Sequence, residues 1–280
     1  MVELAWCTDT HLDFLDDTER LIAFGESLVV NNPDGVVITG DISVSSNLVY
    51  HLSALERIVA RPLYFVLGNH DYFGGSINAI RNEVKKMCEQ SQYLRYLSAM
   101  PYIQLSQDTA IVGHDGWYDA RHGDAKNSSF VMSDWIKIAE FAKSGAVQQL
   151  SDGMISIDSA KIISVSQKLA HDGAVHVMNC IKSAVKYSSN IVVATHFPPF
   201  VEVHRPGVRT ADVSYHPWYT SKVFGDMMLQ AASAFPSVNF TILCGHTHGR
   251  HSLQVQDNLR VHVGASSYGS PRLAEIMNFP

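Results

Sequence analysis

Along the N-terminal part of the chain, hydrophobic positions form two kinds of pattern. Short, nearly continuous apolar runs at 2–7, 35–39 and 62–67 are typical of buried strands. Between them, 48–60 has apolar residues at helical spacing, and 16–31 is predicted to be a helix that ends at the Asn-Asn-Pro-Asp-Gly run. The order strand, helix, strand, helix, strand predicts βαβ units, and therefore a largely parallel sheet covered by helices.

The remainder of the chain continues with the same kinds of segment. A charged helix is predicted at 77–90. Short strands are predicted at 102–105, 109–112, 190–195 and 238–244. Two alternating runs within 252–263 predict a hairpin around Asp257-Asn258. Residues from about 130 to 188 are mainly helical in pattern. Because no repeat or low-complexity linker divides the chain, we expect a single domain over 1–280 with a helical insertion.

The composition is that of a globular protein. The chain has 280 residues and a mass of 31.0 kDa, with 46% hydrophobic and 17% charged residues, which excludes a disordered, collagen-like or coiled-coil chain. Lys and Arg number 21 against 27 Asp and Glu, so the net charge is −6. This balance predicts no extended footprint for nucleic acid.

The sequence also bears on the cellular setting. No apolar run approaches the ~20 residues that a membrane helix needs, and the N-terminus shows no secretory signal. The four cysteines are widely separated and form no Cys-x-x-Cys pair, which disfavours a disulfide scaffold or a zinc knuckle. We therefore expect a reducing, cytoplasmic setting and no membrane partner.

Potential metal ligands directly follow five of the predicted strands. They are Asp9 and His11, Asp41, Asn69 with His70 and Asp71, His196, and His246 with His248. In open α/β sheets the carboxyl ends of parallel strands meet at the crevice where ligands bind, so residues far apart in sequence come together there. Within each of the two pairs Asp9/His11 and His246/His248, side chains two positions apart on an extended backbone project to the same side.

The type and number of these side chains predict two transition-metal ions. Oxygen and imidazole nitrogen donors without thiolate suit Mn, Fe, Zn or Ni, and so many imidazoles disfavour calcium. A closed structural zinc site has four ligands, whereas seven candidates occur here. Two divalent ions bring more positive charge than Asp9 and Asp41 neutralise, so the site would attract an anionic substrate such as a phosphoryl group. Paired ions also clamp attacking and leaving oxygens and lower the pKa of bound water.

These motifs resemble the pattern of the calcineurin-like metallophosphoesterases, which runs Asp-x-His, Gly-Asp, Gly-Asn-His-Asp/Glu, His and Gly-His-x-His. The matching residues, complete and in the same order, are Asp9-Thr10-His11, Gly40-Asp41, Gly68-Asn69-His70-Asp71, His196 and Gly245-His246-Thr247-His248. The resemblance spans residues 9–248, and between His70 and His196 it is only loose. It implies an α/β fold, a four-layer α/β sandwich in which two mixed β-sheets are flanked by helices.

The resemblance also implies roles for the individual residues. Two divalent or trivalent ions would be bound, one by Asp9, His11 and His248, the other by Asn69, His196 and His246, with Asp41 bridging the two. Metal-bound hydroxide would attack phosphorus in line. His70, which is not itself a ligand in this scheme, would protonate the leaving oxygen or stabilise its charge. Asp71 would orient His70, in keeping with the general need of an imidazole for a partner that fixes its tautomer.

Two loops contain further candidates for substrate binding. One follows the strand at 109–112, and the other follows His196. Loops carry function disproportionately, so we consider as substrate-binding residues Asp115, Trp117, Arg121, His122, His204 and Arg205. For Trp117, packing on the core is an equally good interpretation. For the charged residues of the second loop, simple surface solvation is equally good.

Several functions are compatible with this site. The first hypothesis is a metal-dependent phosphohydrolase acting on a phosphodiester or a small phosphomonoester. A Ser/Thr-type protein phosphatase is an alternative, but the Gly-Asp-x-Val-Asp-Arg-Gly run of those enzymes is here Gly40-Asp41-Ile42-Ser43-Val44-Ser45-Ser46, without the Arg. A nuclease is another, and the acidic balance counts against it. A non-catalytic scaffold is disfavoured because such relatives characteristically lose ligands, whereas all are present here.

Overall fold

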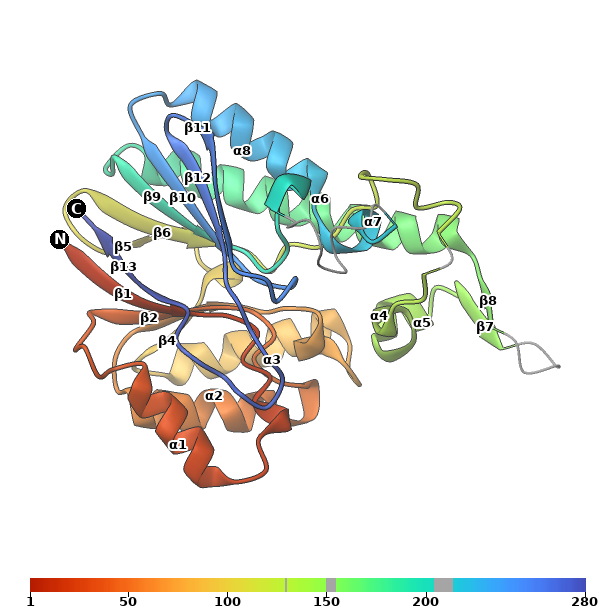
Figure 1. Cartoon of the computed structure of the whole chain (residues 1–280), viewed down its shortest axis with the longest axis horizontal. Helices are drawn as coiled ribbons and strands as arrows, with labels where there is room; N and C mark the ends of the chain where they lie inside the picture. Colours follow the sequence, from red (N-terminus) through yellow and green to blue (C-terminus); the bar gives the residue numbers. More distant parts are fainter. Residues whose placement is uncertain (129, 150–154, 204–213) are drawn as a thin grey trace.

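The computed structural model describes residues 1–128, 130–149, 155–203 and 214–280, and two mixed β-sheets lie face to face between helices (Figure 1). The first sheet has the order β13-β1-β2-β3-β4. Its strands are β1 (Val2–Cys7), β2 (Gly35–Thr39), β3 (Leu63–Val66), β4 (Leu94–Tyr96) and β13 (Glu275–Phe279). β1 to β4 are parallel, and β13 pairs antiparallel with β1, so the two chain ends lie close together (Figure 1).

The second sheet has the order β11-β12-β10-β9-β6-β5. Its strands are β5 (Ile103–Gln104), β6 (Thr109–Gly113), β9 (Asn190–Ala194), β10 (Asn239–Cys244), β11 (His251–Gln256) and β12 (Leu259–Val263). The four central strands are parallel, and the edge strands β5 and β11 run antiparallel to their neighbours. The parallel strands of both sheets therefore end in polar loops on the same side of the molecule.

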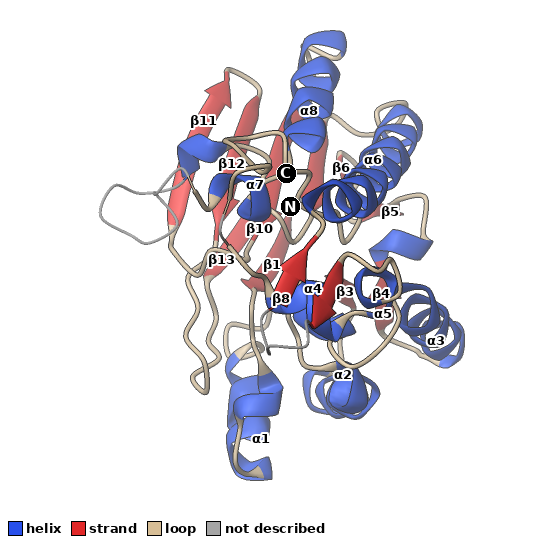
Figure 2. Cartoon of the chain, turned by 90° about the vertical axis from the view of Figure 1, so that its right-hand side faces the viewer, coloured by secondary structure: helices blue, strands red, loops and turns tan. Residues whose placement is uncertain are grey.

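Helices cover the outer face of each sheet and complete four layers, which confirms the predicted sandwich (Figure 2). The first sheet is covered by α1 (Thr18–Ser27), α2 (Ser45–Val59) and α3 (Ile77–Gln90), and the second by α6 (Ser159–Ala184) and α8 (Lys222–Ala234). The short helical elements are α4 (Ser133–Lys137), α5 (Ala139–Ala142), α7 (His216–Tyr219), η1 (Leu12–Phe14), η2 (His70–Tyr72), η3 (Leu97–Ala99) and η4 (Val201–Val203). Among the described residues, no helix combines the length and apolarity of a membrane span.

The core between the sheets follows from the period of two along each strand. In β1, Leu4 and Trp6 face the second sheet, whereas Ala5 and Cys7 face the helices. Both sides of the parallel strands are therefore buried, which is why these strands are nearly continuous apolar runs in the sequence. Leu243 of β10 packs into the same inter-sheet layer as Trp6.

The sequence pattern missed several small elements. β4 was not predicted because it has only three residues, and β13 because Glu275 and Asn278 interrupt its apolar run. Within 130–188, the pattern indicated helix, but the structure adds a two-stranded hairpin, β7 (Val147–Gln149) and β8 (Ile155–Ile157). The C-terminal half of α6 packs on the second sheet, whereas its N-terminal part projects beside the sandwich together with α4, α5 and the hairpin (Figure 1).

A buried carboxylate joins the two sheets at the edge where the loops gather. Asp115, just after β6, is fully buried and accepts five hydrogen bonds. The donors are the Leu67 amide (2.7 Å), the hydroxyls of Ser98 (2.7 Å), Tyr72 (2.6 Å) and Tyr96 (2.7 Å), and Arg81 Nε (2.9 Å). Burial alone would raise the pKa of Asp115, but the Arg81 charge and the hydroxyl donors lower it to about 2. The side chain is thus an ionised structural tie.

Replacing Asp115 is expected to destabilise the fold severely. In Asp115→Ala, Arg81 loses its buried partner and several donors are left unpaired, so the free energy of unfolding should fall by about 3–5 kcal/mol. Equilibrium unfolding in urea measures this loss. The matched control is Asp172→Ala, because Asp172 is exposed and forms a surface ion pair with Lys168; its effect should stay within about 0.5 kcal/mol. Equal stability of the two variants would contradict the role given to Asp115.

Candidate metal centre

The structure brings the seven predicted ligands together at the ends of five strands. They follow β1 (Asp9, His11), β2 (Asp41), β3 (Asn69), β9 (His196) and β10 (His246, His248). The potential ligand atoms form two groups, and within each group all atoms lie within 4.8 Å of one another. One group contains Asp9, His11, Asp41 and His248, and the other contains Asp41, His196 and His246. Asp41 belongs to both groups. Asn69 joins the second group, because its Oδ1 lies 3.2 Å from His196 Nε2.

The backbone at these positions is strained. In the described part of the chain, eight non-glycine residues have positive φ, and five of them are predicted ligands: Asp9, His11, Asp41, His246 and His248. Left-handed backbone is unfavourable for residues with a Cβ and persists where the surrounding structure holds it. Here the Asp9 amide donates to the Gly40 carbonyl (3.0 Å) and the His11 amide to the Asp41 carbonyl (2.9 Å). These hydrogen bonds therefore hold the loop after β1 and the loop after β2 in place against each other.

His196 is oriented toward Asp41 by the backbone. Its Nδ1 lies 2.9 Å from the Thr39 carbonyl, so Nδ1 is the donor and Nε2 faces the site. Nε2 lies 3.4 Å from Asp41 Oδ2. Burial would lower the pKa of His196, but the charge of Asp41 overcomes this and raises it to about 10. A bound cation would replace this proton, since only neutral imidazole ligates a metal.

Asp9 forms the corresponding pair with His248. Its Oδ1 lies 3.4 Å from His248 Nε2, and the His246 amide donates to the same oxygen at 2.9 Å. Burial would raise the pKa of Asp9, yet the His248 hydrogen bond and neighbouring charges lower it to about 2. Burial lowers the pKa of His11 to about 4 and that of His246 to about 3. Both of these imidazoles are therefore neutral and ready to act as ligands.

The residues present fit metal ions. His11 Nδ1 and His246 Nε2 are buried and have no hydrogen-bond partner among the described residues, and a buried unpaired polar atom is costly. The Nε2 atoms of His11 and His248 face each other at 3.2 Å. Carboxylate and imidazole donors without thiolate suit Mn, Fe, Zn or Ni. A cation at the Nε2 atoms of His11 and His248 would relieve their close contact, and a cation at His246 Nε2 would satisfy that unpaired atom.

His70 and Asp71 are placed differently from each other. The His70 ring lines the cavity described below and lies 4.3 Å from the Phe73 ring and 4.7 Å from the His11 ring. Asp71 was expected to orient His70, but the two form no hydrogen bond in the described structure. The Asp71 carboxylate instead accepts from the backbone amides of Ile42 (2.9 Å), Ser43 (2.8 Å) and Gly68 (2.8 Å). Asp71 therefore joins the loop after β2 to the loop after β3.

A cavity of about 280 Å³ opens beside the ligands. Predicted residues that line it are Asp41, Asn69, His70, His246 and His248. Further lining residues, which the sequence analysis missed, are Phe73, Phe130, Val131, Met132, Ser133, Asp134, Lys137, Tyr219 and Tyr268. Most of these come from the segment around α4 and carry no motif. Only the density of aromatic and charged residues around α4 could have indicated them.

The four predicted substrate-binding residues that the structure describes do not line this cavity. Asp115 and Trp117 are fully buried; Asp115 is the structural tie described above, and Trp117 stacks on Phe141 in the core. Arg121 pairs with Asp119 at 3.1 Å, and His122 Nδ1 lies 2.9 Å from the Thr220 hydroxyl. These four residues are thus engaged within the fold. His204 and Arg205 lie outside the described residues.

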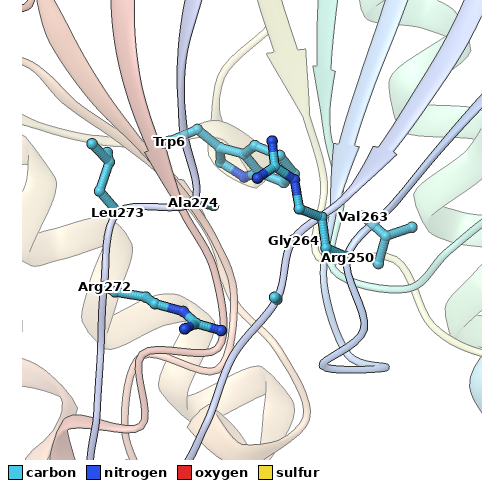
Figure 3. Close-up of a pocket in the computed structure, with 8 residues that line it drawn as sticks. Trp6, Arg250, Val263, Gly264, Arg272, Leu273 and Ala274 are labelled. Carbon is cyan, nitrogen blue, oxygen red and sulfur yellow. The ribbon is translucent and has the colours of Figure 1, made fainter. Parts of the chain in front are cut away.

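A second cavity, of about 290 Å³, lies between the two sheets near the C-terminal strand (Figure 3). It is lined by Trp6, Arg250 and Arg272, among others. Arg250 pairs with Glu275 at 3.1 Å, and the Trp6 indole nitrogen donates to the Thr39 hydroxyl. Because none of the predicted site residues lines it, the cavity at the ligands is the functional candidate.

A glycine substitution tests the close approach of the loops. A Cβ on Gly245 would lie 2.0 Å from Thr8 Oγ1 and 2.1 Å from Asp9 Oδ2, so Gly245→Ala should displace Asp9. We expect Mn²⁺ affinity, measured by calorimetric titration, to fall about 10–100-fold, as for other changes that misplace ligands. In the control Gly249→Ala, the new Cβ meets only the Thr247 carbonyl at 3.9 Å. The same affinity in both variants would refute this account of Gly245.

Solved structures share this fold. A phosphopantetheinyl hydrolase from Mycobacterium tuberculosis matches with a TM-score of 0.64 and 16% identity, covering 95% of this chain and 89% of that one. A dimetal phosphatase from Danio rerio matches with a TM-score of 0.55 and 12% identity, covering 96% and 89%. A protein from Thermus thermophilus matches with a TM-score of 0.53 and 11% identity, covering 94% and 89%. At these identities the likeness concerns the fold.

The sequence itself matches a family. No curated protein matches the chain. The family model described as calcineurin-like phosphoesterase matches residues 3–250, a range that contains all seven predicted ligands and His70. The resemblance on which the sequence analysis rested is thereby confirmed. The chain belongs to the calcineurin-like phosphoesterase family and is a metal-dependent phosphoester hydrolase.

Proposed function

We propose that the protein hydrolyses a small phosphodiester or phosphomonoester at a centre of two metal ions, each Mn, Fe, Zn or Ni. The observation that carries this proposal is the position of Asp41, whose carboxylate belongs to both groups of potential ligands. A carboxylate between two sets of donors suits a bridge between two ions. The ligands proposed for one ion are Asp9, His11 and His248, and those for the other are Asn69, His196 and His246.

The charge balance favours an anionic substrate. Two such ions, when bound, clamp the attacking and leaving oxygens of a phosphoryl group and lower the pKa of water. Asp9 and Asp41 are the carboxylates of the two ligand groups, so four positive charges would meet two negative ones. Lys137 adds a further positive charge at the cavity wall, with its ammonium 4.8 Å from the Phe73 ring. A phosphate group would be held by this excess of positive charge.

His70 is the proposed proton donor to the leaving oxygen. Its ring faces the cavity between His11 and Phe73. Its backbone amide donates to Asp41 Oδ1 at 2.8 Å, so the backbone of His70 is held beside the proposed bridging carboxylate. An imidazole nitrogen there can hold a proton for the departing oxygen, which is the step that a poor leaving group needs most.

The cavity favours a small substrate. Its volume, about 280 Å³, lies just below the ~300–1,000 Å³ typical of small-molecule sites. Phe73, Phe130 and Tyr219 supply apolar wall for the leaving group. Because the fold is shared with a phosphopantetheinyl hydrolase, a phosphopantetheine ester belongs among the diesters to be tested. We also propose a reducing, cytoplasmic setting, supported by four cysteines that are free of disulfides.

Removal of the proposed bridge should abolish turnover. With Mn²⁺ supplied, Asp41→Asn is expected to lower the hydrolysis rates of a chromogenic nitrophenyl phosphodiester and of the matching monoester by about 10²-fold or more, because both ions lose a charged ligand. The ratio of the wild-type rates for the diester and the monoester indicates which of the two substrate classes the protein prefers. Asp226→Asn is the control, since Asp226 is exposed and pairs with Lys222. A full rate in Asp41→Asn would rule out the bridging role.

Loss of His70 should affect substrates unequally. His70→Ala is expected to keep both metal ions but to lower kcat by about 10²–10⁴-fold for an alkyl phosphodiester. The loss should be much smaller for a nitrophenyl ester, whose leaving oxygen needs no proton. Steady-state kinetics over a series of leaving groups, with metal content measured on the same samples, checks this. An equal loss along the whole series argues against proton donation by His70.

A further inference from the structure

An unpaired carboxylate lies beside the proposed metal centre. Asp134 of α4 is fully buried, and neither of its carboxylate oxygens has a hydrogen-bond partner among the described residues. Buried carboxylates are normally paired, because leaving one unpaired costs several kcal/mol. Asp134 lines the same cavity as Asn69 and Asp41. Its oxygens do not belong to either group of potential ligand atoms.

The position of Asp134 is fixed by the segment that carries it. The Gly74 amide donates to the Lys137 carbonyl and the Ala139 amide to the Gly75 carbonyl, both at 2.9 Å. The Trp135 indole donates to the Tyr118 hydroxyl at 3.0 Å, with both side chains buried. α4 is therefore anchored to the turn that follows the Asn69-His70-Asp71 motif, and Asp134 is held against that motif.

The neighbour that matters is the side chain of Asn69. Its two ends differ: Oδ1 faces His196 Nε2 at 3.2 Å, and the amide nitrogen is a donor of two hydrogens. Burial raises the pKa of Asp134 to about 7, and the neighbouring Asn69 side chain counteracts this rise, although neither Asp134 oxygen accepts a hydrogen bond among the described residues. Both residues line the same cavity, and the Asn69 amide nitrogen is a donor of the kind that Asp134 lacks.

We infer that Asp134 is a positioning residue that accepts a hydrogen bond from the Asn69 amide nitrogen and so directs the Asn69 carbonyl oxygen at the second metal ion. This inference rests on the proposed two-ion centre. Asn69 is the one neutral amide among the ligands, and an unrestrained amide can turn either its oxygen or its nitrogen toward the ion. A carboxylate on the nitrogen side selects the ligating orientation and makes the carbonyl oxygen a stronger donor. The ion held by Asn69, His196 and His246 should therefore depend on Asp134.

The test is a calorimetric titration of the full-length protein with Mn²⁺, resolved into two sites. Asp134→Leu should lower the affinity of one site about 10–100-fold and leave the other unchanged. Asp134→Asn should recover most of the affinity, because its amide oxygen can accept the same hydrogen bond. Ile136→Ala is the control for damage to α4, since Ile136 is exposed and does not line the cavity. The unchanged first site in Asp134→Leu also reports that the protein is folded.

A double-mutant cycle separates this role from others. If Asp134 acts through Asn69, the losses from Asn69→Ala and Asp134→Leu should not add in the double variant. Additive losses would overturn the inference, and so would equal losses in Asp134→Asn and Asp134→Leu, which would indicate a direct ligand. Wild-type affinity at both sites in Asp134→Leu would also overturn it. Failure of the proposed function is distinguished from failure of this inference by the wild-type protein alone. The proposed function is wrong if the wild-type protein binds fewer than two ions, or if it binds two ions but hydrolyses no phosphoester.

Discussion

The site depends on how closely the loops at the ends of strands from two different sheets approach one another. A Cβ on Gly68, after β3, would lie 2.7 Å from His196 Nε2, after β9, and one on Gly245, after β10, would lie 2.1 Å from Asp9 Oδ2, after β1. Side chains at these positions would push the loops apart. Asp115 keeps the loops at this distance, because it joins the end of β6 in the second sheet to the Leu67 amide after β3 in the first. Burial on both faces of the parallel strands supplies the rigidity behind this approach.

Charge is arranged around the same loops. Asp41 and Asp9 raise the pKa values of His196 and His248, while burial keeps His11 and His246 neutral. His196, with a pKa of about 10, thus carries a proton that a metal ion must displace. The strain in the backbone of the ligands is consistent with this arrangement, since strained residues cluster where the surrounding structure fixes them for function. The buried charges and the strained backbone of the site therefore lower the stability of the fold, and bound metal ions would offset this loss.

The sequence predicted the parts of the site that are local. Asp9, Asp41 and Asn69 each follow an apolar strand, and the rule that strand ends converge places them together. The sequence did not predict that Asp134 and Lys137 line the cavity, because their position there depends on the tertiary packing of α4 against Gly74 and Gly75. The structural role of Asp115 was missed for the same reason: its five donors lie 17 to 48 residues away. The role of Asp71 required knowledge of which backbone amides face it.

The central claim is that Asp41 bridges two metal ions. A crystal structure of the Mn²⁺-loaded protein, with anomalous diffraction data, tests it most directly. The account predicts two anomalous peaks about 3.5–4 Å apart, one on each side of the Asp41 carboxylate, with Asn69 Oδ1 directed at the peak nearer to His196 and His246. A single peak, or two peaks that do not share Asp41, would contradict it.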